Sequence, residues 1–500
     1  MPHNPDPTTA TPAPVRSAAE PEPLAADPRR WFALALISVA TLMIVLDSSI
    51  VTIALPHAQT DLRISPDNRQ WVVTAYTLPF GGLLLIGGRI ADFVGRKRVF
   101  LIGLLGFAGA SALGAAAVDQ AMLFSARALQ GAFAAVLAPA ALSLLAVTFT
   151  HAAERAKAFS VYGAVQGAGG ALGLILGGIL TEFASWRWTL FVNVPLAIAV
   201  AVLALNAVRE SRAQGDRRYD VPGALLATGG LTALVYGFTQ AASSGVGWLA
   251  PSTLTLLATA LVLLAGFVAR EARTSHPLLP LRVVLDRNRG GALLASLIIF
   301  AGMFGIFLFL TYFFQINLGY GPLTAALGFL PFSAGIIVTA TLVSGLLNRL
   351  GPKPLLVTGT AMGAAGLFML SALHPGSTWL GGVLPAEIVM SIGLGMVFVP
   401  ISTVALHGVA PHDAGVASAV LNATQQVGGA LGTALLNTLY VAAFSSYLAA
   451  HHPVTAAVQD SAYLHGYRIA FIAGGSLITL ALIILLALIN AKRTNPQDAA

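Results

Sequence analysis

Cysteine is absent from the 500-residue chain, so the protein can form no disulfide bond, thiolate nucleophile or iron–sulfur cluster. This absence also leaves the redox compartment unreadable. Charged residues are scarce, at 9% of the chain, while 56% of residues are hydrophobic and the mean hydropathy is +0.80. Ordinary soluble domains are far more highly charged. The composition therefore indicates a protein embedded in a lipid bilayer.

Motifs of several enzyme classes are absent as well. The chain contains no G-x-x-x-x-G-K-[ST] phosphate-binding loop, no H-E-x-x-H zinc motif and no G-x-S-x-G nucleophile motif. We expect His451, His452 and His465 to lie in a solvated loop between the last two helices rather than in a metal site. The sequence thus argues against an enzyme, and we expect no metal and no bound cofactor.

Long apolar runs fill most of the chain. A helix needs about 20 mostly apolar residues to cross a hydrocarbon core of roughly 30 Å, whereas the strands of a membrane barrel alternate. We therefore predict an all-α integral membrane protein. Its fourteen transmembrane helices are expected at about 32–54, 70–90, 98–118, 121–146, 157–181, 189–207, 220–242, 250–270, 289–315, 323–348, 353–374, 379–403, 411–440 and 466–490.

The basic residues are distributed unevenly between the two sides of such a membrane protein. An even number of helices puts both termini on one side, and 22 of the 27 Lys and Arg residues fall there. Only Arg63, Arg69, Arg187 and Arg468 fall on the other side, and Arg127 lies within a helix. The positive-inside rule predicts cytoplasmic termini. Topology thus explains the net charge of +7, and we expect no nucleic-acid partner.

Two segments of the sequence recur in the same order. GGRIADFVGRKRVFLIG aligns with VSGLLNRLGPKPLLVTG at an offset of 256, pairing Asp92 with Asn348 and Gly95 with Gly351. GGALG occurs at 169–173 and again at 428–432, an offset of 259. The similar offsets indicate a duplicated six-helix unit with two helices inserted between the copies. Parallel repeats of this kind build transporters whose substrate path lies between the halves.

The repeat defines a domain organisation, with tails at both ends. The first 28 residues are rich in Pro, Ala and Thr, which is typical of a disordered tail, and the apolar run that follows is too long for a signal-peptide core. We expect a cytoplasmic tail at 1–30, a six-helix bundle at 31–207, two extra helices with cytoplasmic linkers at 208–288, a second six-helix bundle at 289–490 and a cytoplasmic tail at 491–500.

Several motifs together resemble one transporter family. GGRIADFVGRKR is similar to the loop between helices 2 and 3 of the major facilitator superfamily. LDSSIVTIALP, LFSARALQGAFAA, SWRWTLFVNVP and AGVASAVLNATQQVGGALG resemble motifs of helix 1, helix 4, the helix 5 to 6 join and helix 13 in its fourteen-helix drug:proton antiporters. The resemblance runs from about Leu46 to Arg493 and implies the major facilitator fold, two pseudo-symmetric six-helix bundles plus two inserted helices.

The same resemblance implies a function. We expect a proton-coupled secondary exporter of lipophilic compounds, with cationic drugs among the candidates, acting by alternating access and driven by the proton gradient. Its location would be the bacterial cytoplasmic membrane, where we expect it to work as a monomer; a periplasmic adaptor is left open. A dedicated exporter of one metabolite, peptide, lipid or siderophore is the alternative that the sequence does not separate. A membrane-embedded enzyme or a channel is disfavoured.

Three ionisable residues fall inside predicted spans near the outer face: Asp47, Arg127 and Glu387. Each costs at least about 2.5–3.5 kcal/mol in hydrocarbon, so each should face a cavity or a partner. We predict that they bind protons or substrate. The alternative for Asp47 and Arg127 is a static pair. The resemblance does not clearly supply an acid at Glu387, so the choice between coupling and substrate binding is open there.

The remaining candidates lie on helix faces and in the cytoplasmic loop, and each has a structural alternative. Glycines at every fourth position of helix 5 resemble the family's antiporter motif, although Leu174 replaces the usual proline; ordinary small-residue packing is the alternative. Amides are expected to line the cavity, unless they only form hydrogen bonds between helices, and an aromatic side chain is expected to line it too, unless it serves only packing or faces lipid. The loop is predicted to act as a cytoplasmic gate, or else to fix topology alone. These residues are Gly169, Gly173, Gly177 and Gly178 of helix 5; Gln166, Asn422, Gln425 and Phe304 of the cavity; and Gly88, Asp92, Gly95, Arg96 and Lys97 of the loop.

Overall fold

The computed structural model describes residues 28–149, 151–212, 220–242, 246–274, 277–279, 281–409 and 414–490. Within these ranges every regular secondary-structure element is a helix, which confirms the all-α prediction. Most of the predicted N-terminal tail and all of the C-terminal tail lie outside the described residues. The elements are α1 (Arg30–Asp61), α2 (Trp71–Val94), α3 (Arg96–Ala115), α4 (Gln120–Thr148), α5 (Ala152–Phe183), α6 (Trp186–Phe191), α7 (Asn193–Ala207), α8 (Val221–Ala242), α9 (Pro251–Glu271), α10 (Leu281–Val284), α11 (Arg287–Tyr312), η1 (Phe313–Asn317), α12 (Pro322–Gly328), α13 (Leu330–Leu350), α14 (Pro352–Leu370), η2 (Trp379–Val383), α15 (Leu384–Leu406), α16 (Ala414–Ala450) and α17 (Ala456–Leu488).

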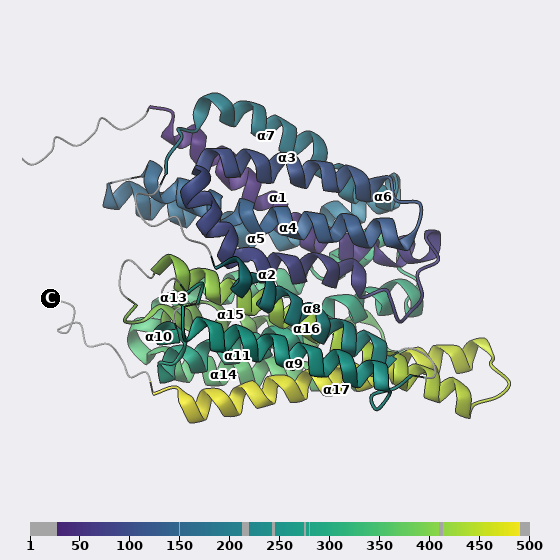
Figure 1. Ribbon diagram of the computed structural model, residues 1–500. Helices are drawn as coiled ribbons and strands as arrows, with labels where there is room; N and C mark the ends of the chain where they lie inside the picture. Colours follow the sequence, from purple (N-terminus) through teal and green to yellow (C-terminus); the bar gives the residue numbers. More distant parts are fainter. Residues whose placement is uncertain are drawn as a thin grey trace, which may run out of the picture.

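Most of the long helices are candidate membrane spans. In the described part of the chain thirteen helices are long and apolar enough to cross a membrane, and α2, bent by 59° between Leu84 and Ile86, makes a fourteenth when its two parts count as one span. The start of α1 and the end of α17 lie on the same side, as Figure 1 shows. We call the end where α1 begins and α17 finishes the terminal end, and the opposite one the distal end.

Two predicted single helices are each interrupted near a proline. The predicted helix 189–207 starts earlier and breaks at Val192 between α6 and α7, and the predicted helix 323–348 breaks at Phe329 between α12 and α13. Pro195 and Pro331 stand within the first three residues after these breaks. Proline has no N–H to donate and its ring clashes with the preceding turn, so the helix restarts there.

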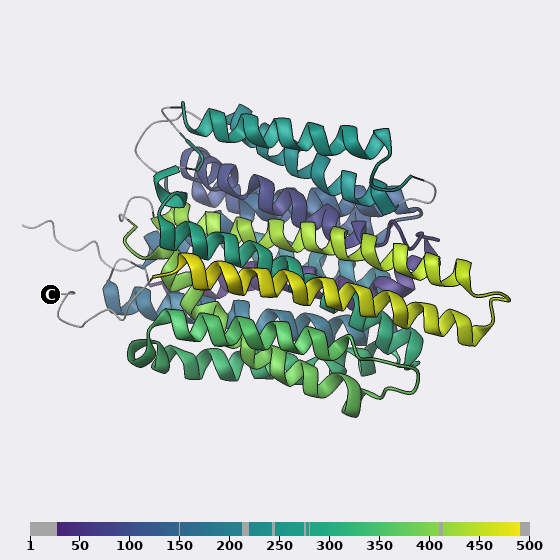
Figure 2. The same ribbon diagram turned by 90° about the horizontal axis from the view of Figure 1, so that it is seen from below.

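The last two predicted spans are too short. The predicted helix ends at 440 and 466 are wrong, because α16 continues to Ala450 and α17 begins at Ala456. The two helices form a hairpin that projects from the distal end (Figure 1, Figure 2). His465 therefore lies in α17 and not in a loop, although His451 and His452 are in the connection. Hydropathy marks only the lipid-immersed part, whereas alanine-rich sequence extends the helix beyond it.

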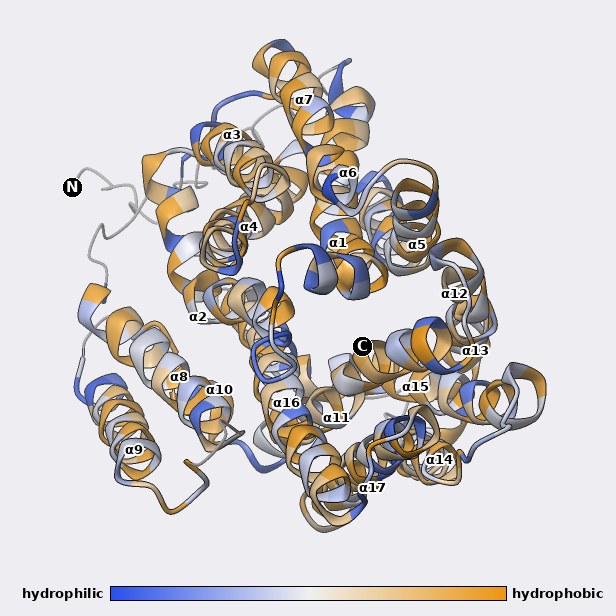
Figure 3. Ribbon diagram, turned by 90° about the vertical axis from the view of Figure 1, so that its right-hand side faces the viewer, coloured by the Kyte–Doolittle hydropathy of each residue, from blue (hydrophilic) through white to orange (hydrophobic). Residues whose placement is uncertain are grey.

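The helices pack in two groups on either side of a central boundary. One group contains α1 to α7 and the other α11 to α17, with α8 and α9 beside α2 and α16 at the edge, as the view from the distal end shows (Figure 3). We call these groups the first and second bundle. Their limits in the sequence, 31–207 and 289–490, stay a prediction.

Glycines paired by the sequence repeat have matching environments. Gly95 and Gly351 both end a helix with positive φ, at 123° and 78°. Such φ values strain any residue that has a Cβ, so glycine is required at both joins. Gly173 lies against Leu46 of α1, and Gly432 lies against Ala301 of α11. The side chain of Asn348, the repeat partner of Asp92, is outside the described part.

Candidate functional site

A buried ion pair joins α1 to α4. The Arg127 guanidinium donates through Nη1 to Oδ2 of Asp47, and the two side chains are 1% and 0% exposed. Arg127 also donates through Nε to the carbonyl of Val72 at 2.9 Å and through Nη1 to Oε1 of Gln130 at 2.9 Å. The structure thus brings together two of the three ionisable residues singled out in the sequence.

The second oxygen of the Asp47 carboxylate is held by amides. Gln130 on α4 donates through Nε2 to Oδ1 at 3.0 Å, and Asn193 donates through Nδ2 at 2.8 Å. Gln130 Nε2 also donates to the hydroxyl of Ser111 on α3 at 2.7 Å. Sequence reasoning missed Gln130, Asn193 and Ser111. The signal for the first two was present, because each is an isolated amide within a motif that we used.

An aromatic ring closes the remaining side of Arg127. The guanidinium carbon lies 4.4 Å from the ring centroid of Tyr76, a cation–π distance. The Tyr76 hydroxyl donates to the carbonyl of Ile44 at 3.3 Å, which fixes the ring against α1. A buried ion pair is tolerated when further hydrogen bonds satisfy both partners, and here they do. We call Asp47, Arg127, Gln130, Asn193 and Tyr76 the Asp47 network.

Glu387 has entirely different surroundings. It lies in the first turn of α15 and is 1% exposed, and neither carboxylate oxygen has a hydrogen-bond partner among the described residues. It therefore makes no hydrogen bond with Asp47 or Arg127. One turn later Ser391 packs against Gly335 of α13, so this part of α15 faces another helix. A buried ionised carboxylate without a partner is very costly, whereas a neutral carboxyl group is much less so.

The four helix 5 glycines face two different neighbours. A Cβ at Gly169 would meet Val45 and one at Gly177 would meet the carbonyl of Ile50, so these two, together with Gly173, pack α5 closely against α1 around Asp47. Gly178 faces Leu323 of α12 in the second bundle. Leu174 is buried, and α5 runs unbroken, as expected where the helix has no proline to kink it.

The predicted cavity residues differ in exposure. Gln166 and Asn422 are exposed, and Gln425 is half-buried. Asn422 donates to the carbonyl of Ser418 in its own helix at 3.0 Å. Phe304 is half-buried and its ring packs against Gly429 of α16. The two exposed amides belong to different bundles.

The loop between α2 and α3 is held by its own bundle. Arg96 donates through Nε and Nη2 to Oδ1 of Asp92 at 2.9 and 2.8 Å. Gly88 packs against Pro139 of α4. Lys97 donates through Nζ to the carbonyl of Leu205, at the end of α7. None of these contacts reaches the second bundle.

Glu210 is a partner of this loop that sequence reasoning missed. Its carboxylate accepts hydrogen bonds from the backbone N–H groups of Lys97 at 3.1 Å and Arg98 at 3.2 Å. These N–H groups are at the start of α3, where they lack partners within the helix and where a negative charge is favourable. The segment after α7 thus caps α3. No periodicity in the sequence marked Glu210.

Hydrogen bonds join the two bundles at the distal end. Gln315 donates through Nε2 to the carbonyl of Ile53 at 2.9 Å, and the Tyr312 hydroxyl donates to Oε1 of Gln59. The backbone N–H of Leu323 donates to Oε2 of Glu182 at 2.8 Å. The distal end is therefore fastened by polar contacts between bundles.

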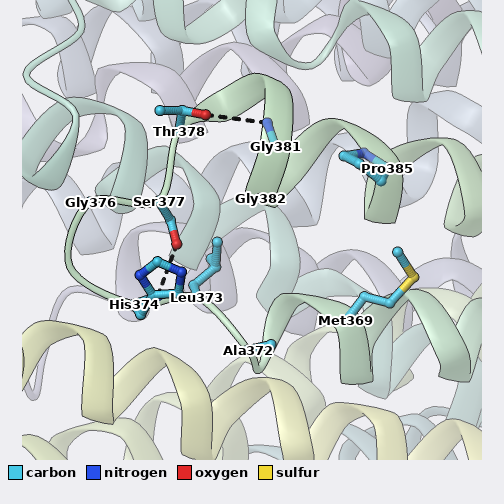
Figure 4. A pocket seen from close by; sticks show the side chains of 10 residues that line it. All are labelled: Met369, Ala372, Leu373, His374, Gly376, Ser377, Thr378, Gly381, Gly382 and Pro385. Carbon is cyan, nitrogen blue, oxygen red and sulfur yellow. Dashed lines mark hydrogen bonds between the residues drawn. The ribbon is translucent and has the colours of Figure 1, made fainter.

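A cavity of about 520 Å³ lies elsewhere at the distal end, around the connection between α14 and η2 (Figure 4). His374 is the one ionisable side chain among the residues that line it, and no predicted site residue does. In the described residues, no group of three or more His, Asp or Glu side chains is arranged to hold a metal ion. This cavity is thus separate from the charged site.

Comparison with known proteins is consistent with this architecture. The family model for the Major Facilitator Superfamily matches residues 37–433. The chain is 47% identical to puromycin resistance protein pur8 of Streptomyces alboniger, covering 97% of this chain and 95% of that protein. It is 42% identical to cephamycin export protein CmcT of Amycolatopsis lactamdurans, covering 81% and 84%.

Solved structures share the fold at low sequence identity. The inward-facing, unoccupied bacterial homologue of the human lysosomal transporter Spinster matches with a TM-score of 0.65 and 16% identity, over 92% of this chain and 97% of that one. Its likeness supports the predicted fold class. The protein belongs to the Major Facilitator Superfamily of membrane transporters, within which it is similar to drug and antibiotic export proteins.

Proposed function

We propose that the protein is a proton-driven exporter of lipophilic compounds, antibiotics among them, that works by alternating access. Its similarity along almost the whole chain to a puromycin resistance protein supports the substrate class. The observation that carries proton coupling is Glu387, a buried carboxyl group inside a membrane span with no hydrogen-bond partner in the described part of the chain. Such a group is stable in this conformation only with a proton bound.

In this mechanism the two acids have separate tasks. Glu387 holds a proton while it is buried and releases it when rearrangement of α13 and α15 brings water to it. The Asp47 network holds a fixed negative charge against Arg127, and α5 slides or tilts on α1 across the glycine contacts beside that charge. Substrate or proton binding that loosens the Asp47–Arg127 pair then changes the contact between α1 and α5.

The terminal end is proposed to face the cytoplasm, because most Lys and Arg residues lie there. Because hydrogen bonds join the two bundles at the distal end, that end is closed, and the proposed conformation is open towards the cytoplasm. The exposure of Gln166 and Asn422 within membrane spans supports it, since an amide is unfavourable against lipid but not in a water-filled cavity. These two amides, with Gln425 and Phe304, are the proposed cavity lining.

The loop between α2 and α3 is proposed to gate the cytoplasmic side. In the inward-open state Asp92 is occupied by Arg96, and Glu210 holds the start of α3. Closing the cytoplasmic side would bring Asp92 and Arg96 against the second bundle. The alternative, that the loop only fixes topology, predicts unchanged transport by Asp92→Asn.

A dedicated exporter of one compound is the second candidate. It is favoured by similarity to proteins that are named for a single compound, such as the cephamycin export protein and a probable actinorhodin transporter of Streptomyces coelicolor. A panel of dyes and antibiotics tested for efflux from whole cells separates the two. Efflux of several unrelated compounds supports a multidrug exporter, and efflux of one compound alone supports a dedicated one.

The deciding experiment is puromycin transport in proteoliposomes with an imposed pH gradient. We expect transport to follow the gradient in the wild-type protein and to lose that dependence in Glu387→Gln. Equal transport with and without the gradient in the wild-type protein would refute proton coupling. A protein-free liposome controls for passive leakage. Asp92→Asn tests the proposed gate separately.

A further inference from the structure

A second buried arginine lies at the distal end, in the connection between α1 and α2. Arg69 is 2% exposed. Its guanidinium carbon is 4.2 Å from the ring centroid of Tyr312 and 4.4 Å from that of Tyr440. Nε donates to Oδ1 of Asn437 on α16 at 3.0 Å, but the buried Nη2 has no hydrogen-bond partner.

Arg69 differs from Arg127 in having no directly paired acid. Among the described residues no ion pair joins a carboxylate to its guanidinium, and Asp67, two residues earlier in the same connection, acts on it only as a more distant charge. An amide oxygen and aromatic faces compensate its charge only in part, and a buried charge that is not balanced favours an anion nearby. Arg69 therefore presents one open donor and a net positive charge.

Arg69 lines a cavity between the two bundles. The cavity has a volume of about 350 Å³ and is lined by residues of α1, α11, η1, α16 and α17 as well as the α1–α2 connection. Its lining includes Arg69, the exposed Arg63 and three tyrosines, together with Pro56, Ile316 and Phe444, and contains no Asp or Glu among the described residues. Its size is within the range of small-molecule sites.

We propose that this cavity binds an amphiphilic organic anion, whose carboxylate or phosphate group pairs with Arg69 and whose apolar part packs against the aromatic wall. A guanidinium binds such groups through charge-assisted hydrogen bonds. Arg63 at the rim adds a second positive charge. Because both bundles form the walls, the bound anion stabilises the closed distal end and must leave before that end opens.

Further hydrogen bonds hold Asn437, the partner of Arg69, in position. Asn437 donates through Nδ2 to Oε1 of Gln70 at 2.6 Å and to the carbonyl of Pro66 at 3.2 Å, and Gln70 donates to the hydroxyl of Thr239 on α8. Arg69 is thus held in place by its neighbours before any ligand arrives, which reduces the entropy lost on binding.

The test is calorimetric titration of the full-length protein in phosphatidylcholine nanodiscs with hexyl phosphate, and with hexylammonium as the control of opposite charge. We expect hexyl phosphate to bind and hexylammonium to bind at least roughly tenfold more weakly. Arg69→Gln should weaken hexyl phosphate binding by roughly 10- to 100-fold. Arg468→Gln, at an exposed arginine outside the cavity, should leave it unchanged.

Either equal binding of the two probes or undiminished binding by a folded Arg69→Gln protein would overturn the proposal. If that variant does not fold, Arg63→Gln at the rim takes its place, with an expected loss of roughly 2- to 5-fold, and unchanged affinity there counts against the site. Nanodiscs that contain phosphatidylglycerol identify the source. Weaker hexyl phosphate binding in them shows that a lipid headgroup competes for the site, and unchanged binding shows that a soluble anion is the occupant. The test does not depend on proton coupling.

Discussion

Asp47 and Glu387 are both buried carboxyl groups within membrane spans, one in each bundle, but their surroundings are opposite. The Asp47 carboxylate accepts hydrogen bonds from Arg127, Gln130 and Asn193, whereas no described residue forms a hydrogen bond with either oxygen of Glu387. A network of this kind stabilises a charge, and its absence favours a neutral group. The burial of a carboxyl group therefore does not by itself assign its role in transport. Its hydrogen-bond and ion-pair partners decide whether it stays charged.

The largest expected effect comes from removing the charge at Asp47. Asp47→Asn should abolish proton-driven efflux and lower the free energy of unfolding by about 3–5 kcal/mol, because Arg127 is left buried without its counter-charge. Proteoliposome efflux and thermal unfolding of the purified protein measure the two effects.

A double variant separates stability from coupling at the same site. Asp47→Asn combined with Arg127→Gln removes both charges, so it should recover part of the lost stability but none of the transport. Wild-type transport by Asp47→Asn alone would remove this residue from the mechanism.

Matched glycines compare the helix packing of the two bundles. A Cβ at Gly432 would lie 1.9 Å from the backbone carbonyl of Ala301, and one at Gly173 would lie 2.0 Å from the Ser49 hydroxyl. Gly432→Ala should therefore destabilise the protein by about 1–3 kcal/mol, and Gly173→Ala by less, because a side chain can move and a backbone cannot. Gly170, with nothing within 4 Å, is the control. Its change to alanine should stabilise the helix, and an equal loss at all three positions would contradict the packing argument.

Glu387→Gln should have little effect on stability, although it removes the proposed proton-binding group. No hydrogen bond of the carboxyl group is lost, so we expect the free energy of unfolding to change by less than about 1 kcal/mol. Transport should no longer vary with the pH gradient. A large loss of stability would mean that Glu387 is ionised and held by a counter-charge, which would make it resemble Asp47.

The smallest effect is expected from an ion pair at the terminal end, between Arg30 at the very start of the first span and Glu154 outside the spans. Arg30 donates to both oxygens of Glu154 at 3.0 and 2.8 Å, and this hydrogen bonding lowers the pKa of the Glu154 carboxyl from its ordinary value. Because the pKa is lower in the folded state, the pair contributes stability above the unfolded pKa, and this contribution is lost as the pH falls through the folded one.

Thermal unfolding of the wild type and of Glu154→Gln at several pH values measures this contribution. A slightly lower Tm for the variant at neutral pH should disappear in acid. A difference that persists in acid would assign the effect to packing instead of charge. The result also gives a scale for how little a solvated pair contributes beside the buried pair of Asp47 and Arg127.

The all-helical fold class and the order of its candidate membrane spans could be read from the sequence. The order of the apolar runs and the resemblance of the loop around Asp92 predicted the fold class, because bilayer thickness and the cost of charge in lipid act on local sequence. Helix ends were predicted less accurately, since α16 and α17 continue as helices beyond their apolar parts. The pairing of Gly95 with Gly351 was also visible, because a repeated backbone turn leaves a repeated glycine.

The sequence by itself determined which polar residues lie inside apolar runs, and so it found Asp47, Arg127 and Glu387. Only the tertiary structure decided their partners: Asn193, 146 residues from Asp47, donates a hydrogen bond to that carboxylate, while no described residue forms a hydrogen bond with the Glu387 carboxyl group. It also placed Glu210 at the start of α3 and, among the described residues, gave the Arg69 guanidinium no ion pair with an acid. The physical reason is that the cost of burial belongs to a single residue and can be read locally, whereas its compensation depends on groups that only packing brings within hydrogen-bond distance.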